Sequence, residues 1–153
     1  MSDNNSFLVF SGTKTRYLAE KICASLGVPL GNLVRTQFSD GEFVVSYEQS
    51  IRGKDVFLVQ STFPNSDNLM ELLIMADAAK RASARTISAV VTHYGYSRQE
   101  RKAAPREPIT AKLVADLLEV SGIDNIITVD LHQDAIQGFF DTVSYTHLRA
   151  HET

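Results

Sequence analysis

The chain has 153 residues, of which 44% are hydrophobic and 22% charged, and its formal net charge is −3. These values are ordinary for one globular domain with its own core. The acidic balance argues against nucleic acid or a membrane surface as partner, since either favours a basic excess. No apolar run approaches the roughly 18 residues of a membrane span. A single cysteine, Cys23, excludes an internal disulfide and indicates a reducing, cytoplasmic compartment.

The first half of the chain alternates short apolar runs with helical patterns. Strands are predicted at residues 7–10, 33–38, 43–47 and 56–60, and helices at 17–26 and 66–82. In the first helix the spacing of Leu18, Ile22 and Leu26 predicts one inward face. Cys23 lies in the same pattern, so we expect a buried structural thiol.

The second half continues the alternation, with strands predicted at 87–91 and 126–129 and a helix at 110–120 that Thr110 could cap. Strands that alternate with helices predict parallel β-α-β units and hence an α/β sheet covered by helices on both faces. Ligands of such sheets bind beyond the carboxyl ends of the strands. We expect three features there: the 39–42 turn, the 93–108 loop and the 130–132 segment.

The 93–108 loop is polar and cationic in a chain that is acidic overall. From Arg98 to Glu107 it carries four cations and two anions. Arginine side chains suit phosphate oxygens, and Gly95 would permit a close backbone approach. The pattern fits equally a flap that orders on a polyphosphate and a solvated surface loop.

Two other segments could carry chemistry. The run from Phe38 to Glu42 places an aromatic ring beside Asp40 and Glu42, but an Asp-Gly turn between strands needs no ligand. Asp130 and His132 point to one face of an extended chain and could hold a divalent cation. Magnesium prefers oxygen ligands, so a buried histidine bonded to Asp130 remains the alternative.

Eight segments, in this order and spacing, resemble the ribose-phosphate pyrophosphokinase family. They are FSDGE (38–42), SIRG (50–53), NLMELLIM (68–75), KRASA (80–84), YGYSRQERK (94–102), REPITAKLVADLLE (106–119), VDLH (129–132) and IQGFFD (136–141). Each segment alone would be weak, whereas the ordered set is specific.

The resemblance implies a phosphoribosyltransferase-like fold, duplicated as two domains in a full-length member. It implies that ATP gives its diphosphoryl group to ribose 5-phosphate, which yields phosphoribosyl diphosphate and AMP with Mg²⁺ as cofactor. It also implies a homo-oligomer, from dimer to hexamer. Positioning and charge neutralisation dominate such chemistry.

The resemblance also assigns residues. The ATP-binding set is Phe38, Asp40, Gly41, Glu42, Arg98 and Gln99, the first four supplied across a subunit interface. The metal set is His132 with Asp130. The regulatory phosphate or ADP set is Ser50, Arg52, Ala82 and Ser83.

Two departures and one missing region affect these assignments. Glu100 stands where the family often has aspartate, and residues 133–135 depart from the usual Ala-x-Gln after the histidine. The acidic segment that binds ribose phosphate and the catalytic lysine have no counterpart here. We therefore expect residues 1–141 to be the N-terminal ATP-binding domain and the chain alone to be inactive.

The last residues, 142–153, do not match the family. Residues 143–153 back-translate into a DNA sequence that resembles a transposase-type sequencing adapter read in frame. We expect this tail to be non-native and loosely placed, with a divergent native C-terminus as the alternative.

Other function classes fit less well. The chain has no Walker A sequence, no G-x-G-x-x-G and no G-x-S-x-G. A non-catalytic regulatory or associated subunit of the same fold remains the main alternative. A stand-alone phosphoribosyltransferase is disfavoured because the acidic phosphoribosyl-diphosphate segment is missing.

Overall fold

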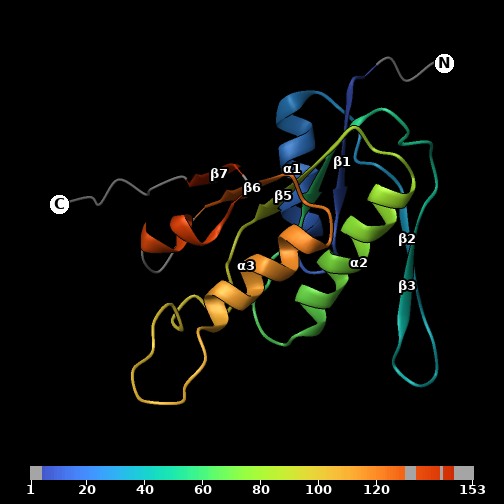
Figure 1. Cartoon of the computed structure of the whole chain (residues 1–153). Coiled ribbons are helices and arrows are strands. Elements are labelled where there is room, and N and C mark those ends of the chain that lie inside the picture. The colour runs from blue at the N-terminus through green and yellow to red at the C-terminus, as the bar shows by residue number, and fades with distance from the viewer. Residues whose placement is uncertain (1–4, 130–133, 142, 147–153) are drawn as a thin grey trace.

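The computed structural model describes residues 5–129, 134–141 and 143–146. In chain order the elements are β1 (Phe7–Ser11), α1 (Arg16–Leu26), β2 (Leu33–Gln37), β3 (Phe43–Tyr47), β4 (Asp55–Val59), α2 (Asp67–Arg81), β5 (Thr86–Val91), α3 (Thr110–Val120), β6 (Asn125–Thr128), the 3₁₀ helix η1 (Asp134–Phe139) and β7 (Val143–Thr146). Every element expected from the sequence is confirmed to within one or two residues at each end (Figure 1).

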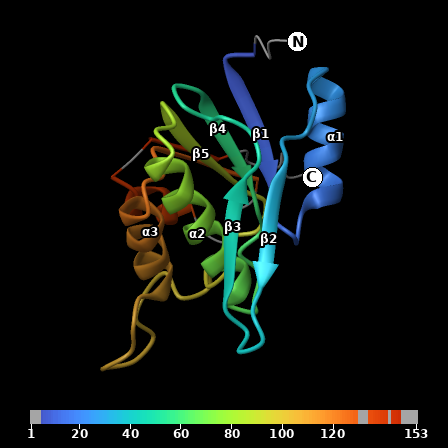
Figure 2. The same cartoon turned by 90° about the vertical axis from the view of Figure 1, so that its right-hand side faces the viewer.

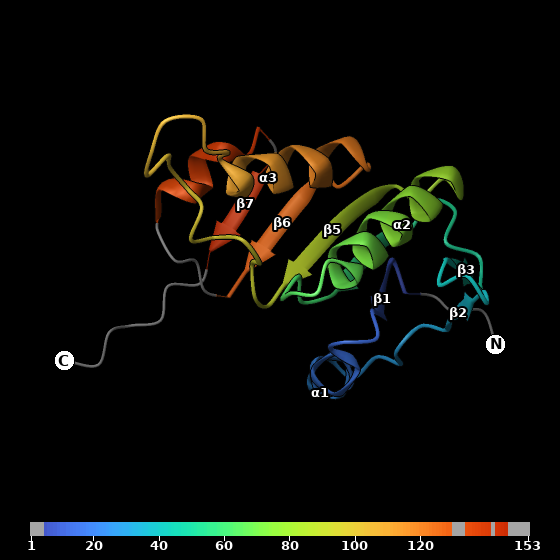
Figure 3. The same ribbon diagram turned by 90° about the horizontal axis from the view of Figure 1, so that it is seen from below.

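The main sheet has five parallel strands in the order β1-β4-β5-β6-β7. Helix α1 lies on one face of this sheet, and α2 and α3 lie on the other (Figure 3). Parallel neighbours need crossover connections, and the helices supply most of them. The predicted α/β sheet with helices on both faces is therefore confirmed.

The strands send alternate side chains to two apolar clusters. In β4, Val56 and Leu58 face the larger cluster beneath α2 and α3, whereas Val59 faces the smaller cluster beneath α1. Helix α2 contributes Leu72 and Met75 to the larger cluster, and both are fully buried. Because burying one such side chain stabilises the fold by roughly 1.5–3 kcal/mol, this cluster holds the strand ends at fixed positions.

Helix α1 packs differently from the expectation. The predicted inward face is wrong for Leu18 and Leu26, which are 37% and 56% exposed, whereas Ala19 and Cys23 are buried. Small side chains on the contact face let the helix backbone approach the sheet closely, which leaves the longer ones at the margin. Cys23 is buried as expected, and burial raises the pKa of its thiol.

Strands β2 and β3 form a separate antiparallel hairpin rather than part of the main sheet. The hairpin packs on α2, where the Tyr47 hydroxyl donates to the Met75 carbonyl at 2.8 Å. Figure 2 shows the hairpin beside α2, with its tip projecting at the same end of the molecule as the loop before α3. The sequence prediction that the 39–42 turn follows a strand of the main sheet is therefore wrong. The two strands of an antiparallel hairpin form their main-chain hydrogen bonds with each other, so they do not need to join the main sheet.

Part of the segment that the sequence predicts to be loosely placed is a strand. Residues 143–146 form β7, which pairs in parallel with β6 so that Asn125 lies opposite Val143. Pairing uses main-chain groups, so an exposed sheet edge accepts an extended segment with little regard to its side chains. The domain boundary at residue 141 and the non-native origin of the tail stay predictions.

Within the part of the chain that the structure describes, no helix is both long enough and apolar enough to cross a bilayer.

Candidate functional site

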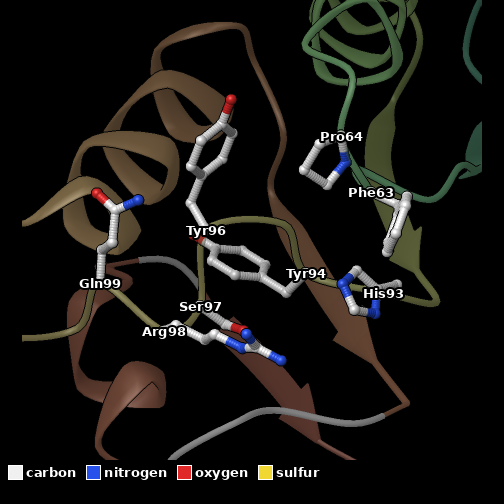
Figure 4. A pocket seen from close by; sticks show the side chains of 8 residues that line it. All are labelled: Phe63, Pro64, His93, Tyr94, Tyr96, Ser97, Arg98 and Gln99. Carbon is white, nitrogen blue, oxygen red and sulfur yellow. The ribbon is translucent and has the colours of Figure 1, made fainter.

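A cleft of about 580 Å³ opens where β4 and β5 end. The described residues that line it are two from the segment after β4 and six from the loop after β5 (Figure 4): Phe63, Pro64, His93, Tyr94, Tyr96, Ser97, Arg98 and Gln99. The cleft therefore lies at the carboxyl ends of parallel strands, where the sequence predicts a ligand site.

Main-chain contacts fix the two segments that form the cleft. The Thr62 N–H and hydroxyl both donate to the His93 carbonyl, at 3.0 and 3.1 Å. The same hydroxyl accepts the Gly95 N–H at 2.8 Å. A Cβ at position 95 would overlap the Thr62 carbonyl oxygen. The close approach expected at Gly95 is therefore made to Thr62, within the protein, and not to a ligand.

The loop between β5 and α3, residues 92–109, is called the flap below. Tyr94 anchors its start in the core. The Tyr94 side chain is 1% exposed, and its hydroxyl donates to the Ala111 carbonyl at 2.9 Å. Its ring meets that of Phe140 edge-on, with centroids 5.8 Å apart. Burial raises the pKa of Tyr94 well above its ordinary value, so this tyrosine is a neutral structural donor.

Arg98 and Gln99 follow Tyr96, whose positive φ of 65° turns the chain outward. Arg98 is exposed, and its guanidinium has no hydrogen-bond or ion-pair partner among the described residues. The Gln99 side-chain oxygen accepts from the Thr110 hydroxyl, and the Gln99 carbonyl accepts the Ala111 N–H at 3.2 Å. Arg98 thus lines the cleft, whereas Gln99 is tied to the start of α3.

The start of α3 also differs from the expectation. Ile109 holds the N-cap position without a side-chain cap, and Thr110 is the first helical residue. The Thr110 hydroxyl is engaged with Gln99, so it does not cap the helix. This contact joins the flap to α3.

The rest of the flap, residues 101–109, is exposed. One carboxylate oxygen of Glu107 accepts the N–H groups of Ala103 and Ala104, at 3.0 and 2.9 Å, and shapes the loop from within. The Glu100 side chain is 13% exposed, and its nearest cation is Arg101 at 3.9 Å. The flap therefore presents its cations to solvent, and Glu107 shapes the loop, whereas the buried Glu100 Oε2 has no hydrogen-bond partner among the described residues.

The 38–42 turn closes the β2–β3 hairpin. The Phe38 N–H donates to the Glu42 carbonyl at 2.7 Å, and the Glu42 N–H donates to the Asp40 carboxylate at 3.0 Å. Gly41 has a φ of 96°, which glycine adopts without strain. The Phe38 ring is 52% exposed. In Figure 1 this turn and the flap lie on opposite sides of the molecule, so the chain does not bring them together by itself.

Phe63 and His93 line the cleft but do not stand out in the sequence. Their rings meet with centroids 5.0 Å apart and planes at 64°. The signal that could have found them is position: each residue follows a buried parallel strand by a few residues.

The residues that the resemblance assigns to a regulatory site lie together. The segment with Ser50 and Arg52 meets the segment with Ala82 and Ser83, where the Gly53 N–H donates to the Ser83 carbonyl at 2.9 Å. All four assigned residues are exposed. They precede β4 and β5, at the end of the sheet opposite the cleft.

Asp130 and His132 lie outside the described residues. The strand before them, β6, ends beside β5, which leads into the cleft. Among the described residues, no group of three or more His, Cys, Asp or Glu side chains is placed to hold a metal ion.

The comparisons with known proteins agree with one another. Residues 7–122 match the family model described as the N-terminal domain of ribose phosphate pyrophosphokinase. The ribose-phosphate pyrophosphokinase of Porphyromonas gingivalis is 66% identical over 148 residues, which cover 97% of this chain and 47% of that protein. The Agrobacterium fabrum protein of the same name is 56% identical over 134 residues, or 87% of this chain and 43% of that protein.

A solved structure gives the same result. The crystal structure of phosphoribosylpyrophosphate synthetase from Mycobacterium smegmatis superposes with a TM-score of 0.89 at 43% identity, and the match covers 93% of this chain and 48% of that one. The chain spans about half the length of the relatives that it matches. It belongs to the ribose-phosphate pyrophosphokinase family.

Proposed function

We propose that this chain is the ATP-binding half of a ribose-phosphate diphosphokinase and that its cleft holds the polyphosphate of ATP. The observation that carries the proposal is Arg98, an exposed guanidinium without a partner among the described residues, in a cleft at the carboxyl ends of β4 and β5. A guanidinium fits phosphate oxygens through two parallel hydrogen bonds. Gln99 supports the site by joining the flap to α3.

The adenine would be bound by a second copy of the chain. Phe38, Asp40, Gly41 and Glu42 form an exposed turn on the side of the molecule away from the flap. An exposed ring beside carboxylates suits a purine, since the ring can stack and the acids can accept from its amino group. A homo-oligomer that brings this turn against another copy's cleft would complete the site.

Magnesium would enter with the triphosphate. We assign Asp130 and His132 to its neighbourhood, because they follow the strand next to the one that leads into the cleft. A cation there would neutralise the charge that develops on the transferred phosphoryl oxygens. The exposed group of Ser50, Arg52, Ala82 and Ser83, at the other end of the sheet, would bind a regulatory phosphate or ADP.

Ribose 5-phosphate would bind to the half of the relatives that this chain does not span. The chain carries no counterpart of the acidic ribose-phosphate segment or of the catalytic lysine. We therefore expect no release of AMP that depends on ribose 5-phosphate from the purified 153-residue chain. Measurable release would show that the chain is active alone and would overturn this part of the proposal.

Calorimetric titration of the chain with ATP and Mg²⁺ tests the site. Arg98→Ala should weaken binding about tenfold or more, because it removes charge-assisted hydrogen bonds of roughly 1.5–3 kcal/mol each. Phe38→Ala should weaken binding under conditions where the chain associates. Arg16→Ala removes an exposed cation on α1 and serves as the control. Unchanged affinity in both Arg98→Ala and Phe38→Ala would reject the assigned site.

A further inference from the structure

We propose that His93 is a second phosphate-binding side chain of the cleft, aimed by Phe63 and acting beside Arg98. This inference rests on the proposed function and adds a residue to its site. The family resemblance assigns no role to His93, and the evidence for it is geometric.

The backbone of His93 is held in place. Its carbonyl accepts two hydrogen bonds from Thr62, at 3.0 and 3.1 Å, and Thr62 also accepts the Gly95 N–H. These contacts tie the segment after β4 to the loop after β5. The side chain of His93 is exposed at the cleft wall. Because its backbone is already fixed, a ligand does not need to order this part of the loop before it binds.

Among the described residues, the ring of Phe63 lies against the ring of His93. The two rings meet with centroids 5.0 Å apart and planes at 64°. Edge-to-face pairs of this kind are worth roughly 0.5–1.5 kcal/mol beyond the area they bury. The Phe63 ring has no hydrogen-bonding group, so the contact orients the imidazole without using its nitrogen atoms.

The cleft is chemically suited to an anion. The eight described residues that line it include an arginine and a histidine, and none of these eight is a carboxylate. Among the described residues, neither the Arg98 guanidinium nor the His93 imidazole has a hydrogen-bond or ion-pair partner. In Figure 4 the Arg98 side chain extends toward the side of the cleft on which His93 lies. Two separate donors on one wall fit an extended polyphosphate better than a single small anion.

Binding of inorganic tripolyphosphate with Mg²⁺ to the 153-residue chain tests the inference, since this probe has phosphates but no base. His93→Ala should weaken binding about tenfold, the loss of one hydrogen bond to a charged group. His93→Gln retains an N–H donor and should stay within about threefold of the unchanged chain. Phe63→Leu should give an intermediate loss, because the imidazole remains but is no longer aimed. Thermal melting verifies that each variant is folded, and Arg16→Ala is the control.

The possible outcomes separate this inference from the proposed function. A loss in Arg98→Ala together with unchanged binding in both His93 variants would reject the role of His93 and leave the ATP site standing. Unchanged binding in Arg98→Ala, or no binding by the unchanged chain, would reject both. If His93→Ala weakens binding of adenosine but not of tripolyphosphate, His93 contacts the base and the phosphate assignment is wrong.

Discussion

Replacing Gly95 by alanine should damage both the stability of the chain and its cleft. The added Cβ would lie 3.0 Å from the Thr62 carbonyl carbon and closer still to its oxygen. Both partners are main-chain segments held by the sheet, so neither yields as the end of a flexible side chain would. Overpacking of this kind costs roughly 1–3 kcal/mol. Loss of the Gly95 N–H bond to Thr62 adds about 0.5–1.5 kcal/mol, which gives a total of about 1.5–4.5 kcal/mol.

Urea unfolding of Gly95→Ala measures this loss, with Gly138→Ala as the matched control. A Cβ at Gly138 meets nothing within 4 Å. The control should change the free energy of unfolding by no more than about 0.5 kcal/mol. Gly95→Ala should also weaken binding of ATP, since Arg98 follows in the same loop. If Gly95→Ala unfolds at the same urea concentration as Gly138→Ala, the contact between Gly95 and Thr62 does not stabilise the cleft.

Three further predictions follow from other buried or charged groups. Glu71→Gln should cost about 2–3 kcal/mol in urea unfolding, because the 2%-exposed Glu71 accepts two bonds from Thr13 at 2.8 Å, and no loss would contradict this. Hydrogen bonds from Arg85 lower the pKa of Asp55 from 3.8 to about 2, so its contribution is complete above pH 3.8 and lost as pH falls toward 2. The free energy of unfolding should therefore decrease less steeply with falling pH in Asp55→Asn than in the unchanged chain. An equal slope in the two proteins would refute the ion pair between Asp55 and Arg85. Tyr94→Phe should cost about 1 kcal/mol in thermal unfolding through its lost hydroxyl bond, and an unchanged midpoint would refute it.

The sequence predicts the main sheet well because its local and long-range signals agree. Strand β4 is apolar from Val56 to Val59, and β5 is apolar except for Thr86 and Ser88. Helix α2 repeats its apolar side chains at helical spacing. A continuous apolar strand suits burial on both faces of a sheet, and helical spacing of apolar side chains suits burial of one helix face. The structure buries both elements in these ways. The position of the cleft follows from the same topology, since the loop that carries Arg98 begins where β5 ends.

Other features depend on contacts that no local pattern encodes. The β2–β3 hairpin reads as two strands, but only its packing on α2 shows that it stands apart from the main sheet. Strand β7 forms because β6 offers an open edge, and its Val143, Tyr145 and Thr146 are residue types that suit a strand. Leu18 and Leu26 have the spacing of a buried face, yet α1 packs through Ala19 and Cys23.

The candidate site shows the same division. The cationic composition of the flap indicates Arg98, because a charged side chain can be identified from the sequence alone. Phe63 and His93 become visible only when the segment after β4 is placed against the loop after β5. Gly95 is recognisable as a glycine that the backbone requires, but the structure is needed to show that Thr62 is what it approaches.

A crystal structure of the chain with Mg²⁺ and a non-hydrolysable ATP analogue tests the central claim most directly. We predict phosphate oxygens within hydrogen-bond distance of the Arg98 guanidinium, at about 2.7–3.2 Å, in the cleft after β4 and β5. A nucleotide whose phosphates contact only Arg52 and Ser83, at the opposite end of the sheet, would contradict the account.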